Sequence, residues 1–126
     1  MERDGQMSEE EYILKWSQVS HYWQTTFSKP ADLNGMLFLI GQREIDQTKI
    51  KYKKQEKMDL FHVAICKLLS QDGYYEMIGH DDEGWPHYEQ LKELPAIDIF
   101  TQEKILREKI INYFEQENII TFQIIT

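Results

Sequence analysis

Apolar residues recur at helical spacing in three separate stretches of the chain. In 8–27 the apolar positions return every three or four residues, at Tyr12, Ile13, Trp16, Val19, Trp23 and Phe27. Similar stripes run through 53–70, at Met58, Phe61, Ile65, Leu68 and Leu69, and through 102–117, at Ile105, Leu106, Ile110, Tyr113 and Phe114. Apolar residues at this period form one face of an amphipathic helix. We therefore predict three helices with these bounds.

The residues that flank the stripes support the same bounds. Ser8 precedes Glu11 by three residues, which is the capping-box pattern, and glutamates fill the first turn of the helix. Gly73 is suited to end the helix at 53–70. Thr101 is a favourable N-cap for the helix at 102–117, and Asn118 can end it.

The segment ADLNGMLFLIGQREI at 31–45 has two interpretations. Its apolar residues follow a helical rhythm after Pro30, although Gly35 and Gly41 each cost a helix about 1 kcal/mol relative to alanine. The run MLFLI alone would also suit a buried strand, because short apolar runs do not discriminate between the two. We favour a helix, in which Gly41 marks a place where another helix approaches closely.

Residues 74–91 lose the helical stripe. Their aromatic and aliphatic residues favour extended backbone. Between them, Asp-Asp-Glu-Gly at 81–84 is a turn sequence in which Gly84 supplies a positive φ. Pro86 is compatible with an edge strand. We predict a β-hairpin or an ordered extended loop here.

These elements together predict a mainly α protein of about four helices, with the small β-hairpin or loop inserted between helices three and four. A length of 126 residues fits one domain over 1–126, in which residues 1–7 are polar and expected to fray. The tail 119–126 is uncharged and rich in β-branched residues, so it needs cover. The tail can be shielded from solvent by pairing with the hairpin, by packing on the helices or by a second subunit. Its sequence is compatible with a strand and with a helix extension.

The charge of the chain argues against two classes of partner. Its net charge is -8, whereas a general nucleic-acid binder needs a basic face, and the same acidity disfavours anionic membrane surfaces. We expect neither partner. The single cysteine, Cys66, suits a compartment that keeps thiols reduced, and the N-terminus lacks the apolar core of a signal peptide. The expected location is the cytoplasm.

The stretch HDDEGWPHYEQ at 80–90 gathers histidines and carboxylates around a turn. If its strands pair, His80, His87 and Asp82 are candidate ligands, because transition metals accept imidazole and carboxylate together. The spacing matches no established metal signature. A solvated acidic turn explains the stretch more simply, so we expect no cofactor.

Two further histidines, His21 and His62, accompany apolar helical stripes. Asp59 precedes His62 by three residues, an offset used in helix-bundle metal centres, and Cys66 follows it by four, on the same helical face. No acidic residue lies within one turn of His21. Each histidine is explained more simply as satisfied in the core, and Cys66 as a small buried hydrophobe.

Aromatic residues and charges suggest a surface for recognition. Tyr74, Tyr75, Trp85 and Tyr88 are candidate ligand or interface residues, because these side chains bury area while keeping a polar group. The same rings would also serve to cover the helical core. Residues 49–57 hold five lysines and one glutamate, and 80–93 hold five acids and one lysine. Complementary patches of this kind meet within one chain or between two copies, although a solvated helix start explains the lysines more simply.

No nucleophile elbow, SxxK pair or phosphate-binding glycine loop occurs in the chain. The sequence hypothesis is therefore a protein that acts through protein–protein contacts as a homodimer, without catalysis. The alternative is a small metal-dependent or ligand-binding enzyme. Its site would use His80 and His87 with neighbouring carboxylates, or His62 with Asp59.

Overall fold

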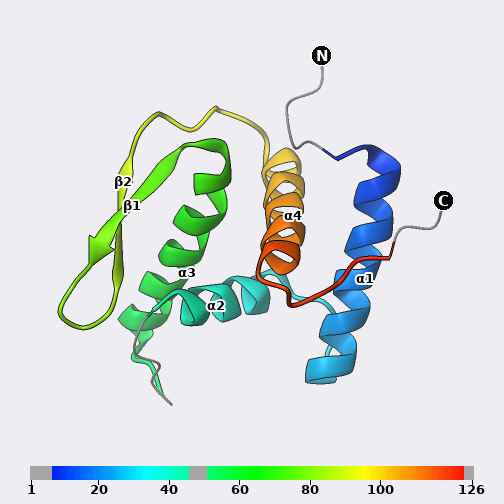
Figure 1. Cartoon of the computed structure of the whole chain (residues 1–126), viewed down its shortest axis with the longest axis horizontal. Coiled ribbons are helices and arrows are strands. Elements are labelled where there is room, and N and C mark those ends of the chain that lie inside the picture. The colour runs from blue at the N-terminus through cyan, green and yellow to red at the C-terminus, as the bar shows by residue number, and fades with distance from the viewer. Residues whose placement is uncertain (1–6, 46–50, 124–126) are drawn as a thin grey trace. The chain divides into compact units, whose positions relative to one another are not determined.

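The computed structural model describes residues 7–45 and 51–123. These residues form four α-helices, a short 3₁₀ turn and one β-hairpin, in the order α1 (Glu9–Phe27), α2 (Leu33–Glu44), α3 (Lys54–Leu69), η1 (Ser70–Asp72), β1 (Tyr75–His80), β2 (Pro86–Gln90) and α4 (Ile99–Gln116) (Figure 1). The predicted fold class is confirmed, including the helix in 31–45 and the hairpin between α3 and α4. None of these described helices has the length and apolar character needed to span a bilayer.

The described chain divides into two compact units. The first contains α1 and α4 and is built from residues 7–32 and 99–123, so it combines the first and the last segments of the described chain. The second contains α2, α3 and the hairpin, and it is built from residues 33–98 without 46–50. The expectation of one domain over 1–126 stays a prediction. The expected fraying of residues 1–6 lies outside the described residues.

In the first unit α1 and α4 lie side by side and run in the same direction (Figure 1). Ser8 caps α1 as predicted, since its Oγ accepts a hydrogen bond from the Glu11 N–H at 3.1 Å. Tyr22 of α1 meets Phe114 of α4 edge to face, with 6.0 Å between the ring centroids. Aromatic pairs in this geometry stabilise a contact beyond the area that they bury.

For α4, the predicted start of the helix is wrong and the predicted end is confirmed. The helix begins at Ile99, so the prediction that Thr101 is its N-cap is wrong, and Thr101 lies in the first turn. Asp98 comes directly before Ile99, and aspartate is at least as favourable at an N-cap as threonine, so the sequence allows the longer helix. Asn118 has a φ of 58°, and the Ile119 N–H donates back to the Phe114 carbonyl at 2.9 Å. The predicted end of the helix at Asn118 is confirmed.

Residues 119–123 form neither a strand nor a helix extension. They run beside α1, where the Gln18 side chain donates to the Gln123 carbonyl at 3.0 Å and accepts from its N–H at 2.9 Å. Packing on a helix is therefore the cover that these tail residues use. The last three residues, 124–126, lie outside the described part of the chain.

The second unit is built on the contact between α2 and α3. A Cβ placed on Gly41 would lie 2.3 Å from the backbone oxygen of Leu60, which confirms the predicted close approach of another helix. Ile45, Tyr52 and Leu60 form a buried cluster, and Phe38 and Trp85 pack against it. The hairpin is therefore tied to the helices through the Trp85 ring.

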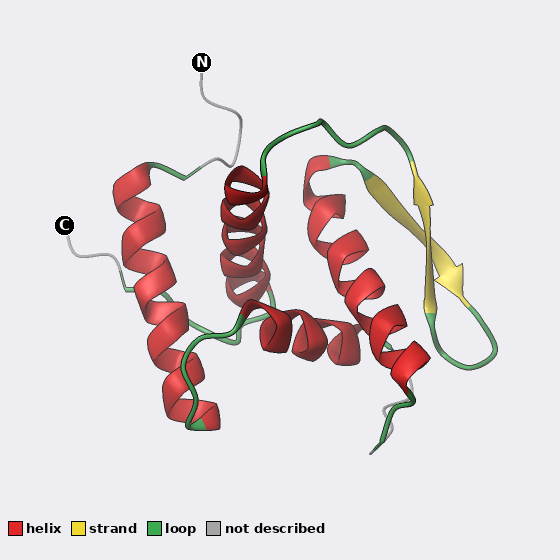
Figure 2. Cartoon of the chain, turned by 180° about the vertical axis from the view of Figure 1, so that it is seen from behind, coloured by secondary structure: helices red, strands yellow, loops and turns green. Residues whose placement is uncertain are grey.

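The hairpin follows α3 directly. Gly73, with a φ of 78°, closes η1 and leads the chain into β1. The strands pair antiparallel from Tyr75 with Gln90 to His80 with Pro86, and a bulge falls between Met77 and Gly79. Each strand of a two-stranded sheet is an edge, which is where a proline is tolerated. Figure 2 shows the hairpin running alongside α3.

Candidate functional site

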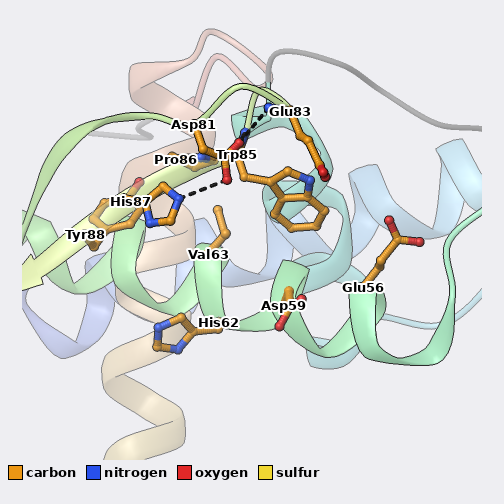
Figure 3. A pocket seen from close by; sticks show the side chains of 10 residues that line it. All are labelled: Glu56, Asp59, His62, Val63, Asp81, Glu83, Trp85, Pro86, His87 and Tyr88. Atoms are coloured by element: carbon orange, nitrogen blue, oxygen red, sulfur yellow. Dashed lines mark hydrogen bonds and ion pairs between the residues drawn. The ribbon is translucent and has the colours of Figure 1, made fainter.

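A groove of about 370 Å³ lies between α3 and the hairpin in the second unit (Figure 3). Both elements contribute side chains to it. From α3 come Glu56, Asp59, His62 and Val63, and from the hairpin come Asp81, Glu83, Trp85, Pro86, His87 and Tyr88. Its lining is therefore dominated by carboxylates and imidazoles around aromatic rings.

The first turns of α3 hold two of the carboxylates. Glu56 Oε1 accepts the N–H of Lys53 at 2.9 Å, which satisfies a backbone donor at the start of the helix. Asp59 Oδ1 accepts from Gln55 Nε2 at 3.2 Å. Glu56 and Asp59 are three residues apart, so they lie on one face of α3, the face that borders the groove.

Asp81 organises the turn of the hairpin. Its Oδ1 accepts the backbone N–H groups of Glu83 at 2.9 Å and Trp85 at 3.0 Å, and its Oδ2 lies 3.0 Å from His87 Nε2. The hydrogen bond with His87 and, to a smaller extent, the one from the Trp85 N–H hold the pKa of the Asp81 carboxyl below its usual 3.8. Asp81 is therefore ionised at neutral pH. Gly84 has a φ of 86°, as the turn sequence predicts.

Two of the four aromatic candidates line the groove. Trp85 packs against the buried cluster and also borders the groove, where Figure 3 shows its indole ring beside the carboxylates of α3. Tyr88 is half-buried, and burial, together with the charge of Glu44, raises its pKa to about 12. Its phenol is therefore neutral at physiological pH. These rings fold back toward α3 and form part of the groove at the same time.

The other two aromatic candidates lie at the open end of the hairpin. Tyr74 comes just before β1, with Lys92 Nζ 4.4 Å from the centroid of its ring. Tyr75 pairs with Gln90 in the sheet register. Neither residue lines the groove. An interface that contains all four aromatic residues stays a prediction.

The candidate metal ligands are spread over the hairpin. His80 is opposite Pro86 and His87 is opposite Gly79, so the two histidines project from opposite faces, because successive residues of a strand alternate. The carboxylate that meets His87 belongs to Asp81 and not to the candidate ligand Asp82. Within residues 7–45 and 51–123, no group of three or more His, Cys, Asp or Glu side chains is arranged to hold a metal ion. Asp81 and His87 both line the groove, whereas a metal site at His80, Asp82 and His87 stays an untested alternative.

His62 and Cys66 are in contact, as their spacing allows. His62 Nε2 lies 3.5 Å from Cys66 Sγ, and burial raises the pKa of the thiol to about 11. The thiol is therefore protonated at neutral pH, and a protonated thiol is a poor nucleophile. Cys66 is buried as expected. The interpretation of His21 and His62 as core histidines is wrong, because both are exposed at the edges of their helical stripes.

Sequence reasoning missed the part that Glu56 and Val63 play in the groove. Glu56 follows the residue before α3 by three positions, a pattern that indicates capping and gives no sign of a second role. Both residues face the hairpin only because the chain turns back at Gly73 and lays the strands along α3. No local pattern in the sequence encodes that contact.

The side chains that line the groove are of the types that bind cations, and such binding requires no bond to be made or broken. Carboxylates accept charge-assisted hydrogen bonds from ammonium and guanidinium groups, and an indole face attracts cations. The side chains of His87 and Asp81 are 59% and 40% exposed, so this pair is hydrated, unlike a general base that works in a water-excluded site. No protein-family model, curated protein or solved structure matches the chain.

Proposed function

We propose that this protein acts through contacts with proteins and that the groove between α3 and the hairpin is its docking site for a basic segment. The observation that carries this proposal is that four carboxylates from two elements surround one indole ring. The carboxylates belong to Glu56 and Asp59 of α3 and to Asp81 and Glu83 of the hairpin, and the ring belongs to Trp85. A lysine or arginine side chain would pair with the exposed carboxylates of Asp59 and Glu83 and pack on the ring. The function requires no catalysis.

Other features support this proposal over the alternatives. A buried thiol with a raised pKa and an exposed Asp–His pair favour binding over nucleophilic or general-base chemistry. The net charge of -8 favours a cationic protein segment over nucleic acid as the partner. A reduced, buried Cys66 is compatible with the cytoplasm as the place where the protein acts.

The test is the fluorescence anisotropy of a labelled tetralysine peptide, with a tetraglutamate peptide as its counterpart. We expect saturable binding of tetralysine that weakens as salt rises, because exposed charges are screened. The double variant Asp59→Asn/Glu83→Gln should bind roughly tenfold more weakly, since two exposed ion pairs together contribute about 1 to 2 kcal/mol.

A matched control separates the groove from general acidity. Glu76→Gln/Glu89→Gln removes the same charge from a cross-strand pair on the same hairpin, outside the groove. This variant should bind tetralysine like the unaltered protein. Equal losses in the two double variants would mean that net charge, and not the groove, attracts the peptide.

A further inference from the structure

A second groove, of about 560 Å³, lies in the first unit between α1 and residues 119–123. We call it the tail groove. Its α1 wall runs from Leu14 to Thr26, and its tail wall runs from Ile119 to Gln123. Small-molecule sites in proteins usually have volumes of about 300 to 1,000 Å³, so the tail groove is large enough to hold a small molecule.

The α1 wall is one uncharged face of the helix. Its lining residues recur every three or four positions, and residues at that spacing share a helix face. They are leucine, serine, glutamine, histidine, tyrosine and threonine, and none of them carries a fixed charge. Exposed protein surfaces are usually rich in charged side chains, and 29% of the residues in this chain are charged. An uncharged face of this length therefore fits a site that receives an uncharged molecule.

The tail wall is also uncharged, and it is held at both ends. At one end, the N–H groups of Ile119 and Ile120 donate to the Phe114 carbonyl at 2.9 and 3.2 Å. At the other end, the Gln18 side chain makes its two hydrogen bonds with the backbone of Gln123. Both walls are therefore in place before a ligand arrives, and such preorganisation lowers the cost of binding.

The tail groove offers apolar surface together with polar groups that a ligand can use. Leu14, Ile119 and Ile120 are half-buried and supply the apolar surface. The side chains of His21 and Thr25 have no recorded hydrogen bond within the described part of the chain. Hydroxyl and neutral imidazole groups can each donate and accept. A charged ligand would lose hydration in this groove and would gain no ion pair with its walls.

We propose that the tail groove binds a small uncharged molecule that carries an apolar ring or chain and a hydroxyl or amide group. The apolar part packs against Leu14, Ile119 and Ile120, and the polar group bonds with His21 or Thr25. This inference is independent of the docking site for a basic segment, because the two grooves lie in different units and share no residue.

The test is a titration of the full chain with benzyl alcohol, benzylammonium and benzoate at pH 8, followed by methyl NMR spectra. The three probes share one ring and differ in charge. The net charge of -8 alone would favour benzylammonium over benzyl alcohol and disfavour benzoate. We expect benzyl alcohol to bind roughly tenfold more tightly than either charged probe, because its polar group costs less to desolvate. The shifts should fall on the methyl groups of Leu14, Ile119, Ile120 and Thr25.

A charge placed in the tail groove should change the preference. Thr25→Lys introduces an ammonium group into the α1 wall, and Gln24→Lys adds the same charge at the neighbouring position, outside the groove. Thr25→Lys should strengthen the binding of benzoate by about threefold and weaken that of benzyl alcohol, since an exposed ion pair contributes modestly. Gln24→Lys should leave both affinities unchanged. A variant that had failed to fold could not gain affinity for benzoate.

Other outcomes would overturn the inference. Tightest binding of benzylammonium would mean that general acidity, and not the tail groove, attracts the probes. Equal gains for benzoate in the two lysine variants would mean the same. Shifts at methyl groups of the second unit, such as those of Leu60 and Val63, would place the probe elsewhere. If benzyl alcohol shifts no methyl group in the millimolar range, the tail groove does not bind this class of ligand.

Discussion

Replacing Gly41 with alanine tests the contact on which the second unit is built. The new Cβ would lie 2.3 Å from the oxygen, 2.9 Å from the carbonyl carbon and 3.1 Å from the Cα of Leu60. All three atoms belong to the backbone of α3, so no side-chain rotation can relieve the overlap. The helices α2 and α3 must move apart.

The cost can be worked from these distances. Non-bonded heavy atoms normally sit about 3.5 Å apart, so the helices must separate by roughly 1 Å. Overpacking of a well-packed core costs about 1 to 3 kcal/mol, and the upper end applies because the fully buried Ile40 and Leu60 move with their helices. Removing a glycine from a helix returns about 1 kcal/mol. We therefore expect Gly41→Ala to lower the free energy of unfolding by about 2 kcal/mol.

The assay is urea unfolding followed by circular dichroism at helical wavelengths, with amide hydrogen exchange to show that the loss of protection falls in α2 and α3. Gly73→Ala provides a contrast, because a Cβ there meets no atom within 4 Å and the φ of 78° supplies the only strain. That variant should have a free energy of unfolding about 1 kcal/mol lower than the unaltered protein.

Helix propensity alone predicts the opposite sign for Gly41→Ala. A variant that is as stable as the unaltered protein, or more stable, would show that α2 and α3 do not approach as closely as the structure has them.

Three further predictions concern single side chains. Asp81→Asn should lower the thermal unfolding midpoint at neutral pH and make that midpoint less sensitive to acid. The lowered pKa of Asp81 gives stability that is present above pH 3.8 and lost as pH falls below it, so an unchanged pH profile of the midpoint would argue against the bond with His87. Cys66 should react with a disulfide reagent at pH 8 only as fast as the second unit opens, because burial raises its pKa to about 11 and keeps the thiol protonated; rapid labelling of the native protein would contradict this. The free energy of unfolding that the protonated thiol contributes should be lost only as pH rises from 9.0 toward about 11. Lys15 of α1, whose side chain is 8% exposed, pairs with Glu11 of α1 and Glu115 of α4. Lys15→Ala should lower the free energy of unfolding by about 2 kcal/mol and Lys15→Met by much less, because the buried stem contributes more than ion pairs with two half-exposed carboxylates. Equal losses in urea unfolding would mean that the charge dominates.

At the groove, the local sequence predicts the turn of the hairpin but not the contact between His87 and Asp81. The turn at Asp81–Gly84 was predictable, because an aspartate and a glycine determine such a turn through their own hydrogen bonds and φ angles. That His87 would meet Asp81 and not Asp82 depends on the register after the bulge between Met77 and Gly79. A one-residue change in register reverses every side chain on a strand, and nothing local in the sequence specifies the bulge.

The sequence by itself determined three of the helices and the turn at 81–84, and it favoured a helix over 31–45 and a hairpin or extended loop over 74–91, because apolar periodicity, capping residues and turn glycines act within a few residues of one another. It also predicted the close approach at Gly41. Only the tertiary structure decided that Glu56 and Asp59 of α3 border the same groove as Trp85. That arrangement depends on packing the Trp85 ring against a buried cluster that includes Leu60, which is 25 positions earlier in the chain. Contacts over such separations follow from how the elements pack together, and the local pattern of apolar and polar residues does not specify them.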